Sequence, residues 1–169
     1  MTYARHIGEA LRNARKKLEL TEEACALACG LSDSCYADVE LDDAEFFMNI
    51  SLGTARRICR FLHLDLLALT SQYLSPDLLP VPHRKLIIGD CLPATDAQFY
   101  GRHHLILDTR LAKGMTDEDL ADAIGFEVIT VRELEQTPDY VETLPINVVV
   151  MTAIVLDLDP GQLLCNRAV

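Results

Sequence analysis

The stretch TEEACALACGLSDSCYADVE, residues 21–40, has the pattern of two short helices joined by a glycine turn. Apolar residues recur at helical intervals on both sides of Gly30, and glycine tolerates the positive φ that such a turn needs. Thr21 and Ser32 precede the two periodic runs and are natural N-caps. The stretch therefore predicts a helix-turn-helix. Its apolar positions are Cys25, Ala26, Cys29, Leu31, Tyr36 and Val39.

The same pattern occurs again 95 residues later, where Thr21, Gly30 and Glu40 fall on Thr116, Gly125 and Glu135. Arg15 likewise falls on Arg110, so each copy carries an Arg and a Glu that are 25 residues apart. The apolar positions fall on Leu120, Ala121, Ile124, Phe126, Val131 and Leu134; further on, at a register of 94, Leu62, Leu64 and Leu69 fall on Leu156, Leu158 and Leu163. A repeat of this length in 169 residues predicts two small domains.

Helical periodicity extends beyond the two copies of the motif and predicts an all-α fold. In the first copy, residues 6–19, 51–62 and 64–74 read as the first, fourth and fifth helices. We expect an N-terminal domain at 1–74, a proline-rich linker at 75–98 and a C-terminal domain at 99–169, with LIIGD (86–90) as a brief strand in the linker.

These residues resemble the Cro and phage-repressor (XRE-like) helix-turn-helix family. The family motif, a capping residue followed by Gln, Glu, Glu, Leu, Ala and later a serine-capped recognition helix, falls on Thr21, Glu22, Glu23, Ala24, Cys25, Ala26, Gly30, Leu31, Ser32, Val39 and Glu40. The resemblance implies two tandem lambda-repressor-like domains of about five helices each. It also implies ion pairs between Arg15 and Glu40 and between Arg110 and Glu135.

The resemblance further implies which positions would read DNA: the residue that opens the second helix and three on the recognition helix. In the first copy these are Glu22, Asp33, Ser34 and Asp38; in the second they are Asp117, Val128, Ile129 and Glu133. Base edges and phosphates are contacted mostly by hydrogen-bond donors, and these positions hold carboxylates or hydrocarbons in seven of eight cases. Both copies are therefore degenerate for DNA reading.

The overall charge points the same way. The formal net charge is −11, and residues 100–169 hold 5 Lys/Arg against 12 Asp/Glu. An acidic chain repels a polyanion, because affinity for nucleic acid comes largely from Lys and Arg at phosphates.

Some features keep alternatives open. Candidate phosphate contacts are Arg12, Lys16, Lys17, Arg56, Arg57 and Arg60, although such charges also serve solubility or pair with acids. Val128 and Ile129 suggest a contact with a protein partner or a second copy, unless they are buried internally. The loop containing Phe46, Phe47 and Met48 either covers the core edge or projects as a contact tip.

No catalytic, cofactor or small-molecule site is predicted. Cys25, Cys29 and Cys35 lack the spacing and the histidines of a metal site, and we expect Cys25 and Cys29 to pack in the core. His103 and His104 are adjacent and are expected to point apart. The apolar run 146–156 is shorter than the ~20 residues of a membrane span, and free thiols without a leader segment predict a cytoplasmic protein.

Together these features favour a non-enzymatic regulatory or interaction protein, derived from helix-turn-helix domains, that acts by binding a toxin, a nuclease, a regulator or another copy of itself. The alternative is an XRE-like transcriptional regulator that binds DNA through its N-terminal domain.

Overall fold

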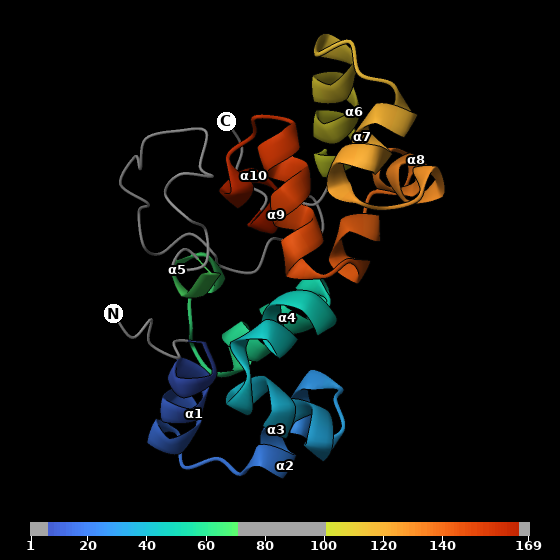
Figure 1. Ribbon diagram of the computed structural model, residues 1–169. Helices are drawn as coiled ribbons and strands as arrows, with labels where there is room; N and C mark the ends of the chain where they lie inside the picture. Colours follow the sequence, from blue (N-terminus) through green and yellow to red (C-terminus); the bar gives the residue numbers. More distant parts are fainter. Residues whose placement is uncertain (1–6, 71–100, 166–169) are drawn as a thin grey trace, which may run out of the picture.

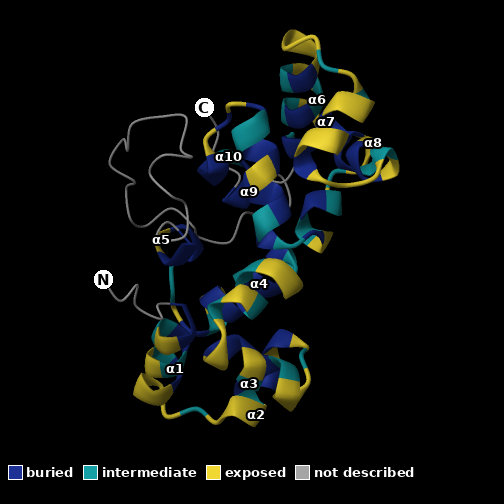
Figure 2. Ribbon diagram, viewed as in Figure 1, coloured by how far each residue is buried: buried dark blue, intermediate teal, exposed yellow. Residues whose placement is uncertain are grey.

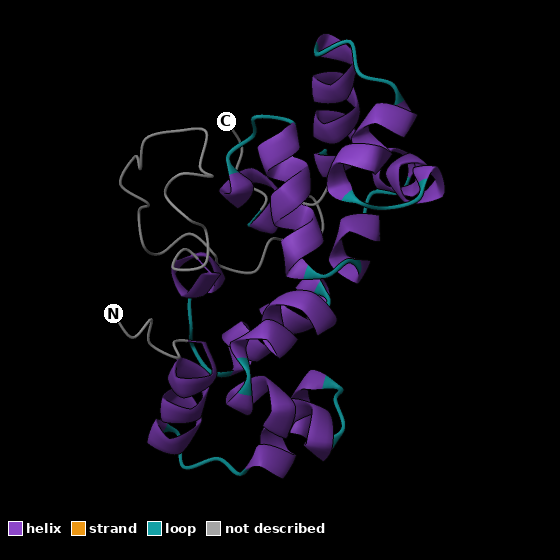
Figure 3. Cartoon of the chain, in the orientation of Figure 1, coloured by secondary structure: helices purple, strands orange, loops and turns teal. Residues whose placement is uncertain are grey.

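The computed structural model describes residues 7–70 and 101–165, and these two segments are mostly helical with no strand (Figures 1 and 3). This confirms the all-α prediction at that level. The first half contains α1 (Ile7–Lys17), α2 (Glu22–Cys29), α3 (Asp33–Leu41), the π-turn η1 (Glu45–Asn49), α4 (Leu52–Phe61) and α5 (Leu66–Thr70). The second half contains α6 (Arg102–Ala112), α7 (Asp117–Ile124), α8 (Val128–Gln136), the 3-10 turn η4 (Tyr140–Thr143), α9 (Ile146–Val155) and α10 (Pro160–Leu164). The expected linker, its strand and both domain boundaries lie outside the described residues.

The turn chemistry read from the sequence explains where α2 and α7 begin and end. The hydroxyl of Thr21 accepts a hydrogen bond from Ala24 N, and that of Thr116 accepts one from Asp119 N, so each satisfies an N–H that the helix leaves free. Gly30 and Gly125 follow the helices with φ of 71° and 73°, a conformation that glycine adopts without strain.

In each half, a buried Arg–Glu ion pair joins the first helix to the third. Arg15 Nε and Nη2 donate to the two carboxylate oxygens of Glu40 at 2.6 and 2.7 Å, while Nη1 reaches the carbonyl of Leu20. Arg110 grips Glu135 in the same way at 2.5 and 2.8 Å and reaches Met115. Each fork therefore fixes α1 or α6 against the following loop and the end of α3 or α8.

The two halves pack on each other through equivalent elements. α4 packs on η4 while α9 packs on η1, and α4 also meets α9 as α5 meets α10. At the centre, Ser51 and Pro145, 94 positions apart, form an isolated antiparallel bridge, and Leu52 N donates to Leu144 O at 2.8 Å. Reciprocal contacts of this kind define an approximate two-fold relation, like that of an isologous dimer.

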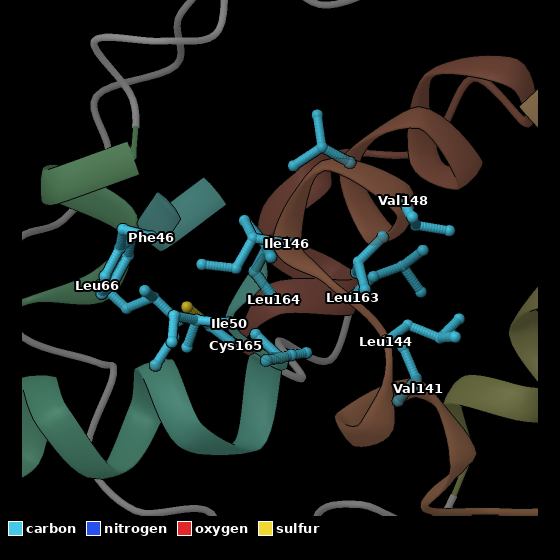
Figure 4. Packing of buried hydrophobic residues seen from close by; sticks show 14 of the residues in the cluster. Phe46, Ile50, Leu66, Val141, Leu144, Ile146, Val148, Leu163, Leu164 and Cys165 are labelled. Carbon is cyan, nitrogen blue, oxygen red and sulfur yellow. The ribbon is translucent and has the colours of Figure 1, made fainter. Parts of the chain in front are cut away.

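One hydrophobic core runs through both halves. Ile50 and Leu66 of the first half lie close to Ile146 and Leu164 of the second in a single buried cluster (Figure 4). Phe46 is fully buried and Phe47 is partly buried, and because α9 packs on η1 this loop forms part of the contact between the halves. Of the three residues Phe46, Phe47 and Met48, Met48 is the one at the surface, with 56% of it exposed.

A polar network also joins the halves. The carboxylate of Glu142 accepts from Arg102 Nη2 at 2.6 Å and lies 3.7 Å from Arg56 Nη1. Arg56 Nε donates to Leu164 O, and Arg102 Nη1 donates to Leu163 O. The backbone of Glu142 approaches Gly53 closely, since a Cβ on Gly53 would lie 3.2 Å from Glu142 O. No helix in the described ranges has the length and apolar character needed to cross a membrane.

Because the core is shared, truncating it in one half should loosen both. We expect Leu164→Ala to lower the free energy of unfolding by about 2–5 kcal/mol, the usual cost of such a cavity. Amide hydrogen exchange should then quicken in α1–α3 as well as in α6–α10. Leu27→Ala is the matched control, because Leu27 is 82% exposed. Loss of protection confined to the second half would show that the halves are independent units.

Candidate interaction faces

The outward side of α2 and α3 forms what we call the first face: Glu22, Asp33, Ser34 and Asp38. All four residues are exposed (Figure 2). Their position follows from the caps, because Ser32 accepts from Cys35 N and so starts α3 with Asp33 at its first position. Tyr36 and Val39 point into the core, which leaves Asp33, Ser34 and Asp38 on the outer side.

The first face offers hydrogen-bond acceptors almost exclusively. Glu22 accepts from Arg15 Nη2 at 2.9 Å, and the hydroxyl of Ser34 lies 3.1 Å from that of Ser32. A carboxylate at neutral pH can accept but not donate. Among these four side chains, only the serine hydroxyl can donate to a phosphate or to a base acceptor.

The equivalent second face, Asp117, Val128, Ile129 and Glu133, lies on α7 and α8. Ile129 is 56% exposed, whereas Val128 is half-buried and packs partly against the core. Glu133 is half-buried and accepts from the hydroxyl of Thr137. The sequence left open whether Val128 and Ile129 are buried internally or contact a partner. Val128 is partly buried against the core, whereas Ile129 lies at the surface.

Arg132 is the cation nearest to the second face. Its Nε donates to Asp117 at 2.7 Å, and its Nη2 lies 3.8 Å from Glu118. Hydrogen bonding to Glu118 and to Arg132 lowers the pKa of Asp117 to about 2, so this carboxylate is charged at neutral pH. Arg132 is thus engaged by acids of its own half.

The candidate phosphate contacts divide into engaged and exposed side chains. Arg12 Nη2 donates to Glu40 O at 3.1 Å, and Arg56 lies in the network between the halves. Arg57 is exposed and donates to the hydroxyl of Thr54. Lys16, Lys17 and Arg60 are exposed. The sequence pattern groups all six, but Arg56 belongs to the internal interface.

The cysteines and histidines of the described segments do not assemble into a metal site. Burial raises the pKa of Cys29 to about 11, so this thiol stays protonated in the core as expected. The expectation that His103 and His104 point apart is wrong, since their rings stack with centroids 3.9 Å apart at the start of α6. Within 7–70 and 101–165, no three His, Cys, Asp or Glu side chains are placed to hold a metal ion.

Sequence reasoning missed the network around Glu142. Its only signal was that Arg102 occupies the place of the buried Ile7 in the repeat, and Arg102 is itself 1% exposed. A buried guanidinium must have partners, which the carboxylate of Glu142 and the carbonyl of Leu163 supply.

Comparison of this chain with known protein families, with curated protein sequences and with solved structures found no match.

The buried ion pair of Arg15 with Glu40 should contribute more to the free energy of unfolding than the exposed hydrogen bond that Arg15 makes with Glu22. Although burial raises the pKa of Glu40, its hydrogen bonds and charge interaction with Arg15 lower it overall. We expect Glu40→Gln to cost about 3–5 kcal/mol of unfolding free energy, because it removes the buried partner of Arg15 and leaves only the half-exposed carboxylate of Glu22 as a countercharge. Glu22→Gln should cost no more than about 1 kcal/mol, since Glu22 is half exposed.

The same pair predicts a dependence on pH. A carboxyl whose pKa is lower in the folded state contributes stability above its unfolded pKa, and that contribution disappears as the pH falls through the folded pKa. Denaturant titrations between neutral and acidic pH should therefore show a smaller acid-induced loss for Glu40→Gln than for the wild type. Equal losses in both proteins would exclude Glu40 as a source of the acid sensitivity.

Proposed function

We propose that each half is a repressor-like helix-turn-helix domain, as the resemblance to the XRE-like family suggests, and that the protein acts without catalysis by binding another protein. The observation that carries this proposal is the chemistry of the two faces. The positions that the family resemblance assigns to DNA reading are exposed or half-exposed, and seven of the eight hold carboxylates or hydrocarbons.

Charge makes those faces unfavourable for DNA. Contacts to phosphate need cationic or N–H donors, and each carboxylate near the backbone adds repulsion. An Asp or Glu can accept a hydrogen bond from cytosine, but one such contact does not offset several unpaired negative charges. A basic protein, such as a toxin, a nuclease or a DNA-binding regulator, is attracted electrostatically to the same faces.

The second candidate function is transcriptional regulation through the first half. It is favoured by one observation, the exposure of Lys16, Lys17, Arg57 and Arg60 on α1 and α4. These side chains could hold phosphates without any contribution from the first face.

DNA binding measured across a salt series separates the two functions. We expect the full chain to show no measurable affinity for fluorescent random or genomic duplexes near ~150 mM salt, because repulsion outweighs the few available cations. If the protein is instead a transcriptional regulator, its affinity for duplex DNA should be measurable and should fall steeply with added salt. In that case Lys16→Ala with Lys17→Ala should weaken binding and flatten the salt slope by roughly one unit for each phosphate that the variant no longer neutralises.

A repaired variant shows whether the faces themselves exclude DNA. Combining Glu22→Gln, Asp33→Gln and Asp38→Arg places donors where the family resemblance puts DNA contacts and makes the chain four charges more positive. We expect this variant to gain salt-dependent affinity for duplex DNA that the wild type lacks, measured by fluorescence anisotropy. If it remains inert while circular dichroism shows an intact fold, the acidic residues are not what prevents binding.

A further inference from the structure

The turn between α7 and α8 carries three neighbouring apolar side chains at the surface. Phe126 follows the turn glycine and is 41% exposed, and Ile129 is 56% exposed one residue after the half-buried Val128. We call these three residues the α8 patch. Exposed aromatic and branched side chains that neighbour one another indicate a contact surface when the fold itself does not require them.

The first half shows that the fold does not require apolar residues at two of these three positions. At the equivalent positions of the same turn it has Leu31, Asp33 and Ser34, and α3 begins there just as α8 does at Val128. Two of the three hydrocarbons are thus replaced by polar residues on the same scaffold.

The α8 patch also lies on a locally unfavourable helix start. Ser32 caps α3 through a hydrogen bond from Cys35 N, whereas Glu127, the N-cap of α8, makes no side-chain capping bond. The next two residues, Val128 and Ile129, are β-branched and lose side-chain freedom in a helix. Natural proteins depart from such local rules mainly at functional positions.

Exposed carboxylates lie near the α8 patch in the sequence, and the cation on α8, Arg132, is bonded to Asp117 and lies 3.8 Å from Glu118. Glu127 lies within the patch, and Asp122 and Glu118 are exposed on α7, with Asp122 one helical turn before Phe126. Two copies of the protein pairing through this patch would bring these acids face to face, which is repulsive. A surface of opposite charge is complementary, so these acids select against a second copy.

Resting on the protein-binding function proposed above, we propose that the α8 patch is the docking surface for a basic amphipathic helix. The apolar side of such a helix covers Phe126, Val128 and Ile129, and lysine or arginine along its edges faces Glu118, Asp122 and Glu127. The start of α3 has a capping serine and polar side chains. It therefore shows how α8 would begin if it did not bind such a helix.

The test transplants the start of α3 onto α8 by combining Glu127→Ser, Val128→Asp and Ile129→Ser. The formal charge of the chain is unchanged, since one acid is removed and one is added. We expect the midpoint of thermal unfolding to stay within a few degrees of the wild type, because the cap that the new serine supplies offsets the partial packing that Val128 loses. The probe is a labelled peptide of about five helical turns that forms a Leu/Lys amphipathic helix, and its affinity for the full-length variant should fall at least tenfold.

Binding of two control peptides and a map of the amide chemical-shift changes complete the experiment. A Leu/Glu helix and a Ser/Lys peptide should both bind the wild type at least tenfold more weakly than the Leu/Lys helix. The amide shifts induced by the Leu/Lys helix in a ¹⁵N-labelled chain should centre on residues 122–133. Equal affinity for variant and wild type, or equal binding of the Leu/Glu helix, overturns the proposal. If the shifts centre instead on α2 and α3, the α8 patch is excluded while protein binding by the acidic first face stands.

Discussion

The grip of one buried arginine on one buried glutamate underlies the geometry of each half. Arg15 with Glu40, and Arg110 with Glu135, hold the first helix, the loop after it and the end of the third helix as one unit. With those ends fixed, the core residues of α3 and α8 determine which side chains must face outward. The character of the outward residues can then vary without loss of the fold, and here these residues are mostly acidic or apolar.

The second constraint is the contact between the halves. Equivalent elements meet about an approximate two-fold axis near Ser51 and Pro145, and the shared core buries the apolar sides of both α4 and α9. An arrangement that two separate chains would form as a dimer is thus built within one chain. Because the halves belong to one chain, their outer faces need not be identical, and the second half has Val128 and Ile129 where the first has Asp33 and Ser34.

Much of this architecture could be read from the sequence, since caps, turn glycines and apolar spacing are local signals. The ion pairs of Arg15 with Glu40 and of Arg110 with Glu135 were implied by the resemblance to the XRE-like family, and the repeat at 95 residues placed the second pair. The Arg56–Glu142–Arg102 network could not be predicted, because it depends on how two distant segments dock, and no local pattern encodes that. The stacking of His103 on His104 was missed for a related reason: the spacing of residues along a helix does not fix side-chain rotamers. The family resemblance implied which residues form the two faces. What these faces bind could not be predicted, because binding depends equally on the surface of the other molecule.

The most direct measurement is a map of where, if anywhere, duplex DNA touches the protein. A ¹⁵N-labelled full-length chain is titrated with a random duplex at low salt, where electrostatic attraction is strongest. If the two faces have lost DNA reading, amides in α2, α3, α7 and α8 keep their chemical shifts throughout the titration. Saturable shifts at the N-terminal ends of α3 and α8, reversed by added salt, would show that these helices still bind DNA.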